Sequence, residues 1–291
     1  MKRKLCRVIP PEYDLKSVNA YLRHELNVSG SLIKQMKKRA DGIMLNGEAV
    51  YVNHTLKCGD TLCVLIGFDD EAFSDIPQND LPLDIVYEDE DLLIINKPAG
   101  CPTHPSLYHY EDSIAGAVMA HFGGKFVFRA VNRLDKGTSG LMVIAKHAYA
   151  HERLKQQLHT DDFVREYLAV VDGVITDNGV IDKPIARCGD SIIKRMVSDN
   201  GENAVTEYTA LKNDGKRTLV KLWLKTGRTH QIRVHLSSIG HPLCGDFLYG
   251  NECGDILRPA LHSYRISLVH PVSGKQLELI CELPDDIAQL I

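Results

Sequence analysis

The sequence predicts an α+β protein of two domains, a small basic domain followed by a larger one that is rich in strands. The 291 residues are enough for two domains, one of which can bury a substantial core. Charge is divided unevenly, because residues 1–66 hold eleven Lys and Arg against six Asp and Glu, although the whole chain has a net charge of −4. From residue 83 onward, strand-like runs joined by turns predict a mixed, mostly antiparallel sheet.

Two short helices are predicted near the start of the chain. Apolar side chains that recur at helical spacing give the first helix a buried face: Leu15, Val18, Leu22 and Leu26. Ser31 is expected to cap the second helix, which carries four cationic side chains on one side: Lys34, Lys37, Lys38 and Arg39. Such a basic face can bind phosphate groups or keep a small domain soluble, and these residues alone leave both interpretations open.

A hairpin and an acidic segment follow. The Asn46-Gly47 pair between two apolar runs predicts a tight hairpin turn, and a strand is expected over residues 62–66. Residues 67–82 contain five acidic side chains, no basic one and two prolines, a composition typical of a linker. We therefore expect a first domain at residues 1–66, a linker at 67–82 and a second domain at 83–291.

The second domain is expected to contain a helix over residues 147–158 and a series of strands. An Asn213-Asp-Gly-Lys segment predicts a hairpin turn between two of them. The strands are expected at residues 85–87, 92–95, 141–145, 166–171, 205–211 and 219–224.

The segment at residues 131–145 has the clearest chemical content in this domain. It places Asp135 between Arg133 and Lys136, ahead of a Gly-Thr-Ser turn and an apolar strand. Adjacent positive charge favours the ionised carboxylate, and side chains at the ends of rigid elements are often the reactive ones. A lone triplet of this kind is usually a solvated turn, so the interpretation depends on the whole segment.

A second polar cluster occupies residues 224–236. Thr229 is expected to cap a helix whose buried face is formed by Ile232, Leu236 and Ile239. Arg233 would then lie on the exposed face, where a guanidinium can reach a carboxylate or a phosphate with paired hydrogen bonds.

No metal site is expected. Three histidines in and after this helix have a spacing that resembles that of zinc ligands, namely His230, His235 and His241, but no cysteine pair accompanies them. The eight cysteines of the chain are scattered, which indicates reduced thiols rather than a disulfide framework.

These segments resemble the motifs of the RluA/RluD family of pseudouridine synthases. Four matching motifs occur in the family's order, and the region that they cover is nearly all of residues 83–275. They are Ile95–Pro98, Asn132–Gly140, Arg165–Leu168, and Thr226–Leu236 followed by Gly240–Asp246 and Ala260–His262. The element order of the first domain resembles an S4-type RNA-binding domain. Two positions depart from the family pattern, since Asn132 stands where His is frequent and Gly137 where Asp is common. The departures put the way in which RNA is held in doubt, but not the reaction.

The resemblance implies an isomerase that converts uridines of RNA to pseudouridine. Asp135 would be the nucleophile, attacking either the uracil ring or the ribose C1′, with Arg233 paired to it. Tyr167 would stack on the target base and could act in proton removal. Arg133 would contact RNA or stabilise the flipped-out base, while Gln231 and Ile232 would shape the pocket. Lys97 is expected to be structural or to face a phosphate.

The expected substrate is large-subunit ribosomal RNA, with transfer RNA as the alternative, and the basic helix would contribute affinity. A non-catalytic RNA-binding or ribosome-assembly factor of the same fold, and a hydrolase with an aspartyl nucleophile, are the competing interpretations.

An isomerisation needs no cofactor, and the sequence has neither a phosphate-binding loop nor a dinucleotide fingerprint. No apolar run is long enough to span a bilayer and the start lacks a signal peptide, so we expect a cytoplasmic protein, acting as a monomer.

Overall fold

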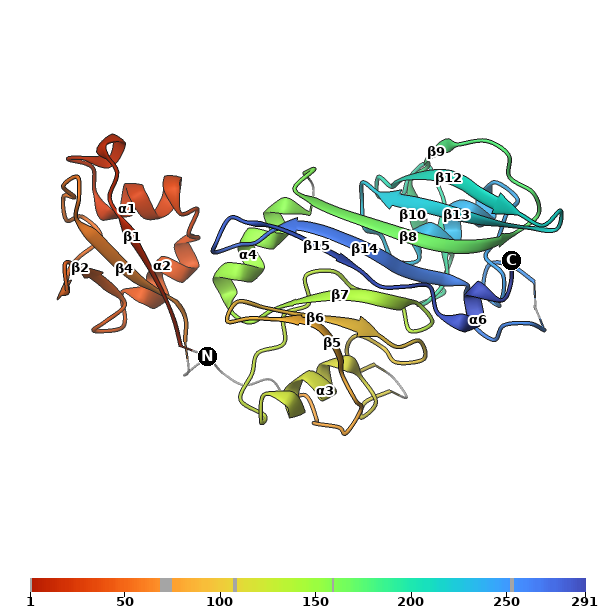
Figure 1. Ribbon diagram of the computed structural model, residues 1–291, viewed down its shortest axis with the longest axis horizontal. Helices are drawn as coiled ribbons and strands as arrows, with labels where there is room; N and C mark the ends of the chain where they lie inside the picture. Colours follow the sequence, from red (N-terminus) through yellow and green to blue (C-terminus); the bar gives the residue numbers. More distant parts are fainter. Residues whose placement is uncertain (1, 69–74, 107–108, 159, 252–253) are drawn as a thin grey trace.

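The computed structural model describes residues 2–68, 75–106, 109–158, 160–251 and 254–291. An N-terminal unit, residues 2–68, lies at one end of a larger body that contains the remaining strands (Figure 1). Helix α4 of the larger body faces this unit (Figure 1). No helix among the described residues is both long and apolar enough to cross a membrane.

The N-terminal unit is an antiparallel sheet covered by short helical segments. Its described strands lie in the order β1-β4-β2-β3. The strands are β1 (Arg3–Val8), β2 (Ile43–Leu45), β3 (Glu48–Ala49) and β4 (Thr61–Gly67). The helical segments are η1 (Pro11–Tyr13), α1 (Val18–Ala20), η2 (Tyr21–Glu25) and α2 (Gly30–Met36).

The predicted hairpin of this unit is confirmed, whereas two helix details are wrong. Asn46 and Gly47 both have positive φ, 51° and 91°, as a tight turn between β2 and β3 requires. Leu15 precedes α1 and is 74 % exposed, so it is not part of the buried face. Ser29 rather than Ser31 caps α2, because its hydroxyl accepts the Leu32 N–H at 3.3 Å. The chain enters this helix two residues earlier than the apolar spacing indicates.

One disulfide contradicts the expectation of reduced thiols. Cys6 and Cys63 face each other in register across β1 and β4 and are bonded, with their Cα atoms 4.1 Å apart. Strand pairing brings together two cysteines 57 residues apart, which their spacing in the sequence could not show. Cys58, Cys101, Cys188 and Cys281 are free cysteines, Cys244 is buried, and Cys253 lies outside the described residues.

The larger body is built on a sheet to which nine of the described strands belong. The main path runs β5-β6-β7-β14-β8-β13-β12-β9, and β15 also pairs with β14. Only β7 and β14 pair in parallel among these strands, which confirms a mixed, mostly antiparallel sheet. The strands are β5 (Asp84–Glu88), β6 (Leu92–Lys97), β7 (Ser139–Ala145), β8 (Phe163–Asp172), β9 (Gly179–Asp182), β12 (Val205–Asn213), β13 (Arg217–Leu224), β14 (Leu261–Val269) and β15 (Gln276–Ile280).

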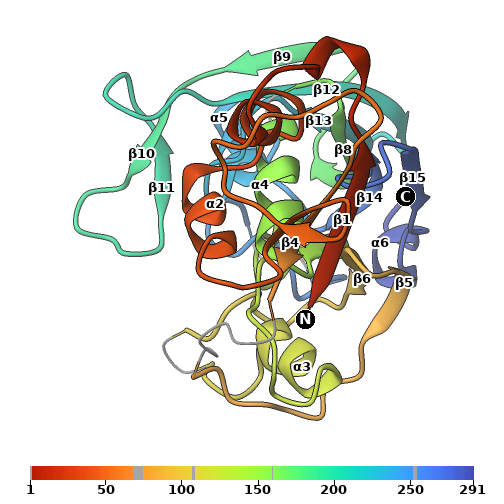
Figure 2. The ribbon, with the colours of Figure 1, turned by 90° about the vertical axis from the view of Figure 1, so that its left-hand side faces the viewer.

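Helices cover both faces of this sheet. The helices are α3 (Ile114–His121), α4 (Ala148–Gln157), α5 (Gln231–Ser238) and the short α6 (Asp285–Ala288). Helices α3 and α5 pack on one face of the strands, and α4 packs on the opposite face. A separate hairpin of β10 (Ile185–Arg187) and β11 (Arg195–Val197) projects beside α5 (Figure 2). Residues 69–74 of the expected linker lie outside the described residues, and Ile76 and Leu81 pack against the core beside α3.

A glycine permits the close approach of β7 and β14. Gly140 has φ +105°, and a Cβ atom there would lie 2.3 Å from the Ser263 carbonyl oxygen. Any other residue at this position would force the two strands apart. Gly140 thereby fixes where the loop before β7, which carries Asp135, leaves the sheet.

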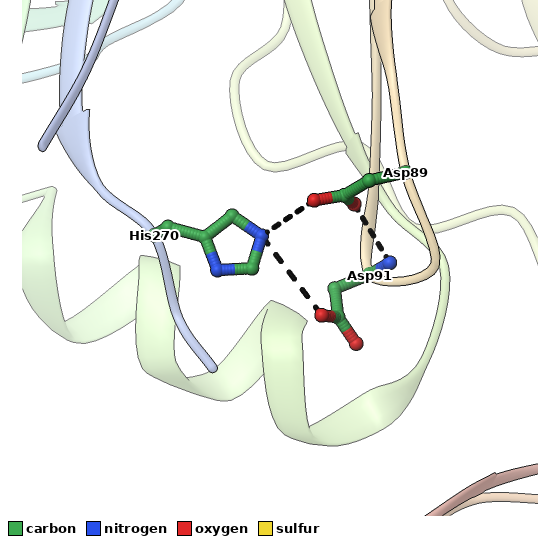
Figure 3. Close-up of side chains that lie close together, drawn as sticks. All are labelled: Asp89, Asp91 and His270. Atoms are coloured by element: carbon green, nitrogen blue, oxygen red, sulfur yellow. Dashed lines mark hydrogen bonds and ion pairs between the residues drawn. The ribbon is translucent and has the colours of Figure 1, made fainter. Parts of the chain in front are cut away.

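A partly buried ion pair joins the N-terminal unit to a charged cluster of the larger body. Arg3 of β1 donates two hydrogen bonds to Asp91, from Nε at 2.7 Å and from Nη2 at 3.1 Å. His147 donates to the same carboxylate at 2.9 Å, and His270 donates to the neighbouring Asp89 at 2.8 Å. Figure 3 shows Asp89, Asp91 and His270 converging from the β5–β6 turn and from the end of β14. These contacts hold the end of β1 against the sheet.

Loss of the Arg3 pair is expected to destabilise this junction in a pH-dependent way. Burial raises the pKa of Asp89 and of Asp91, but hydrogen bonds outweigh this effect and lower both pKa values. The donors are His270 and Tyr87 for Asp89, and His147 and Arg3 for Asp91. A carboxylate whose pKa is lower in the folded state stabilises the fold above its unfolded pKa of about 4, and this contribution is lost as the pH falls further. Arg3→Met should therefore cost about 2 kcal/mol at pH 7 and much less at pH 3.

Thermal unfolding at both pH values measures this difference. Lys2→Met is the matched control, because its pair with Asp41 is exposed to solvent and contributes little to stability. An Arg3→Met protein as stable as the Lys2→Met protein at pH 7 would contradict the proposed role of the junction.

Candidate active site

Asp135 lies in a loop before β7, and its side chain lines a basic cleft. A small hollow of about 50 Å³ surrounds its carboxylate, and a larger cleft of about 720 Å³ adjoins it. Asp135 is the one carboxylate in the lining of the larger cleft, as far as the described residues show. The cationic side chains in that lining are Arg133, Lys155, Arg165 and Arg228. The cleft thus suits a polyanion, although the chain as a whole is acidic.

A buried lysine holds the loop of Asp135 in place. Lys97, at the end of β6, is fully buried, and its ammonium donates to the Pro98, Cys101 and Lys136 carbonyl groups at 2.7, 2.9 and 3.3 Å. Burial lowers the pKa of Lys97 to about 8. The ammonium has no donor left for a ligand. Of the two roles expected for Lys97, the contacts therefore support the structural one and not binding of a phosphate.

The two departures from the family pattern have structural explanations. The Asn132 side chain accepts the Val143 N–H at 2.8 Å and donates to the Leu141 carbonyl at 3.3 Å, so it pairs with β7 as a strand would. At Gly137 a Cβ atom would lie 2.8 Å from Pro259 Cδ. Both residues fix the loop around Asp135, and an aspartate at position 137 would collide with Pro259.

Arg233 bridges two carboxylates beneath the pocket. It lies in α5 and is buried, not exposed as the helix pattern indicated. Its Nε and Nη2 each donate to Asp246 at 2.7 Å, and its Nη1 lies 3.5 Å from Asp135 Oδ2. Asp246 is fully buried, so the tighter pair positions the guanidinium and the looser one leaves Asp135 available for a substrate. The sequence analysis placed Asp246 in a family motif but assigned it no role.

His230 is a further residue at the pocket that the sequence analysis did not place there. It precedes α5 in the left-handed conformation, with φ 58°, and occupies the cap position that was predicted for Thr229. Its Nδ1 lies 2.8 Å from the Tyr249 hydroxyl, which accepts the Arg195 N–H, and its Nε2 lies 3.9 Å from Asp135 Oδ2. With the hydroxyl hydrogen directed to Nδ1, the Nε2–H faces the carboxylate.

Tyr167 lines both hollows from strand β8. Its side chain is only 4 % exposed, so its ring forms part of the pocket wall. Burial raises the pKa of Tyr167, while Arg165 acts in the opposite direction. The phenol is therefore protonated at neutral pH, which favours stacking over a role as a base.

The remaining residues that were predicted at the pocket differ in what they offer. Arg133 is exposed and lines both hollows, whereas Ile232 is buried and contributes apolar wall. Gln231 accepts from Thr226 and Arg228 and donates to the Val205 carbonyl, so its amide holds the loop before α5. The four basic residues predicted to bind RNA from the N-terminal unit line neither hollow: Lys34, Lys37, Lys38 and Arg39.

The histidines with metal-like spacing have other partners. His235 contacts the Thr206 hydroxyl and the Lys183 carbonyl, each at 2.9 Å, and His241 contacts the Asp172 carbonyl. Elsewhere in the described residues, Asp89, Asp91 and His270 lie close enough to hold an ion (Figure 3). However, His270 Nδ1 accepts the Ser273 N–H, so Nε2 carries a hydrogen and cannot ligate a metal.

Comparisons with known proteins identify the family. A family model for RNA pseudouridylate synthases matches residues 91–238. An uncharacterised RNA pseudouridine synthase of Bacillus subtilis, YjbO, is 41% identical over 92% of this chain and 95% of its own length. Ribosomal large subunit pseudouridine synthase D of Vibrio cholerae is 38% identical over 85% of this chain and 82% of its own length.

Solved structures support the same assignment. Human RNA pseudouridylate synthase domain containing 1 matches with a TM-score of 0.58 and 25% identity, over 71% of this chain and 85% of its own. Human RNA pseudouridylate synthase domain containing 4 matches with a TM-score of 0.56 and 28% identity, over 70% and 90%. The family that the sequence motifs indicated is confirmed: the chain belongs to the RNA pseudouridylate synthases.

Proposed function

We propose that this RNA pseudouridine synthase modifies uridines of large-subunit ribosomal RNA, with Asp135 as its nucleophile. The observation that carries the proposal is a carboxylate that lies 3.5 Å from the guanidinium of Arg233 and is the one acidic side chain among the described residues that line a basic cleft. The substrate class is supported by the relative from Vibrio cholerae and by four further relatives with the same printed name, which are 36–42% identical.

Asp135 is suited to covalent catalysis. The Arg233 guanidinium lies 3.5 Å from its carboxylate, and no other carboxylate in the described cleft lining competes for the substrate. One carboxylate oxygen would bond to the uracil ring or to the ribose C1′, and both sites of attack remain open. The N-glycosidic bond breaks, the base turns, and its C5 bonds to C1′. The bond to Asp135 breaks and regenerates the carboxylate, and the C5 proton leaves while N1 gains one. No redox step is involved.

Tyr167 and Arg133 would handle the target nucleotide. A uridine must leave its stack to reach Asp135, which costs a few kcal/mol. The ring of Tyr167 in the pocket wall can stack on the base, and the exposed Arg133 can fill the space that the base leaves or bind RNA. Gln231 and Ile232 would shape the pocket beside Arg233.

The test is a pseudouridine map of total RNA from cells that lack the gene, complemented with either the wild type or Asp135→Asn. We expect one or a few sites in large-subunit ribosomal RNA to be lost, and to return only with the wild type. Lost sites in transfer RNA would replace the proposed substrate but leave the reaction. Sites restored equally by Asp135→Asn would contradict the assignment of Asp135 as the nucleophile. A map that is the same with and without the gene would favour a non-catalytic binding factor.

The N-terminal unit is proposed to be an S4-like RNA-binding domain at residues 1–66, with a linker at 67–82 before the catalytic domain at 83–291. Lys34, Lys37 and Lys38 are exposed on and just after α2, where they can neutralise phosphates. The Arg39 guanidinium lies 3.9 Å from the centre of the Phe68 ring, so it serves packing as well as charge. The basic face is thus mainly a property of the three lysines.

Reversing those three charges should weaken RNA binding and flatten its dependence on salt. For the variant Lys34→Glu, Lys37→Glu and Lys38→Glu, each lost phosphate contact should reduce the slope of log K against log salt by about 0.7–0.9. Filter binding to large-subunit ribosomal RNA from 50 to 300 mM salt measures it. The control reverses three exposed lysines of the larger body: Lys125, Lys212 and Lys275. Equal slopes for the two variants would contradict an RNA-binding surface on α2.

We further propose that the chain acts as a monomer in the cytoplasm, where ribosomal RNA is available. The Cys6–Cys63 disulfide would meet reducing conditions there. The backbone ladder of β1 and β4 pairs the two strands on both sides of these cysteines, so the sheet does not depend on the bond.

A further inference from the structure

Arg165 is a buried cation in the cleft wall that has almost no protein partner. Its side chain is 7 % exposed, and one hydrogen bond links it to the described part of the chain, from Nη2 to the Leu224 carbonyl at 3.3 Å. Its Nε has no acceptor there. The adjacent Glu166 pairs with Arg265 and Lys221 instead. A buried charge without a counter-charge is costly, which points to an anion from outside the chain.

The surroundings of Arg165 favour an anionic ligand. Arg133 and Lys155 line the same cleft, are exposed, and have no ion-pair partner among the described residues. Arg228 also lines it but is paired with Glu202. Asp135 is the counter-charge within the described lining, and it is already shared with Arg233. The cleft therefore has positive charge in excess of what the protein neutralises.

The position of Arg165 relative to Tyr167 fits one nucleotide step. The two residues are two positions apart on β8 and so lie on the same face of the strand, about 7 Å apart. A base stacked on Tyr167 would place a neighbouring phosphate near Arg165. Gly227 leaves room for this, because a Cβ atom there would lie 3.3 Å from Arg165 Nη1 and would crowd the guanidinium.

We propose that Arg165 binds the backbone phosphate next to the uridine that stacks on Tyr167, and that Lys155 binds a following phosphate. Lys155 also lines a second hollow of about 490 Å³ at the junction, together with Arg23 and Ser29 of the N-terminal unit. The RNA strand would thus leave the pocket along α4 toward that unit. This inference rests on the proposed function, since it assumes that the nucleotide in the pocket belongs to an RNA strand.

The test is the salt dependence of binding to a fluorescent twelve-residue oligouridylate, with every variant made in Asp135→Asn so that no turnover occurs. Arg165→Met should weaken binding about tenfold at 100 mM salt and reduce the slope by about 0.7, the value of one phosphate contact on a single strand. Arg165→Lys should keep the slope, because the charge remains. The matched control is Lys212→Met, an exposed cation on β12 that lines neither hollow and should leave the slope unchanged.

A folded Arg165→Met protein with an unchanged slope would overturn the proposal and leave Arg165 as a structural residue. If Arg165→Met does not fold, Lys155→Met decides the question, because Lys155 is exposed. Its slope should also fall by about 0.7, and an unchanged slope would overturn the proposed path. These outcomes are independent of the pseudouridine map. An unchanged map with a reduced slope would refute the proposed function alone, whereas normal modification with unchanged slopes would refute the phosphate subsite alone.

Discussion

Asp135→Asn is expected to reduce pseudouridine formation by at least about 10⁴-fold, because an amide cannot act as the nucleophile. The fold should tolerate the change. The contacts of the carboxylate with Arg233 and His230 are long, 3.5 and 3.9 Å, and Arg233 keeps its pair with Asp246. We therefore expect the free energy of unfolding to change by less than about 1 kcal/mol.

Single-turnover rates, thermal unfolding and RNA affinity, measured on the same preparation, separate chemistry from folding and binding. Asp172→Asn is a suitable control, since it removes a carboxylate from the end of β8 that lines neither hollow. An Asp135→Asn enzyme within tenfold of the wild-type rate would remove Asp135 from the mechanism.

Arg233→Met should have the second largest effect, and it should act on both activity and stability. The variant removes the cation that faces Asp135, which we expect to lower the rate about 10²–10³-fold. It also leaves Asp246 as a fully buried carboxylate without its partner, which should cost about 3–5 kcal/mol.

A double variant separates the two effects. Replacing both members of a buried pair with apolar residues of similar size restores stability in other proteins, because no charge is left uncompensated. Arg233→Met with Asp246→Leu should therefore recover most of the unfolding free energy but none of the activity. Recovery of activity together with stability would show that Arg233 is structural and contributes nothing to the chemistry at Asp135.

Several strands of the sheet were predictable, either as continuous apolar runs, as in β6 and β7, or as an alternating run, as in β13. Residues 92–95 and 141–145 are buried on both faces, and the structure places β6 and β7 there. Helix α3 was not predicted, since nearly all of its residues are apolar or small and six of the eight are buried, so it has no polar face to give a period. Strand β14 was noted only for the motif at its start, because its polar residues Ser263 and Ser267 lie buried within the sheet.

The site was predictable where one segment carries the chemistry, and not where distant segments meet. Asp135, Tyr167 and Arg233 were indicated by their motifs. The burial of Arg233 was not, because helical spacing cannot show that Asp246 packs against the polar face of α5. His230 was named only for its spacing to other histidines. Its place 3.9 Å from Asp135 was not predicted, because the approach of the Asp135 loop to the start of α5 is a tertiary contact.

The measurement that tests the central claim most directly is a reconstitution with purified protein. Large-subunit ribosomal RNA from cells that lack the gene is incubated with the wild type or with Asp135→Asn, and pseudouridine is located and counted by mass spectrometry. We predict that the wild type alone, without added cofactor, fills one or a few sites to near completion, while Asp135→Asn fills none. Equal modification by both proteins would contradict an isomerase that depends on Asp135. So would a lack of modification by either protein on RNA in which the sites that depend on the gene are still uridine.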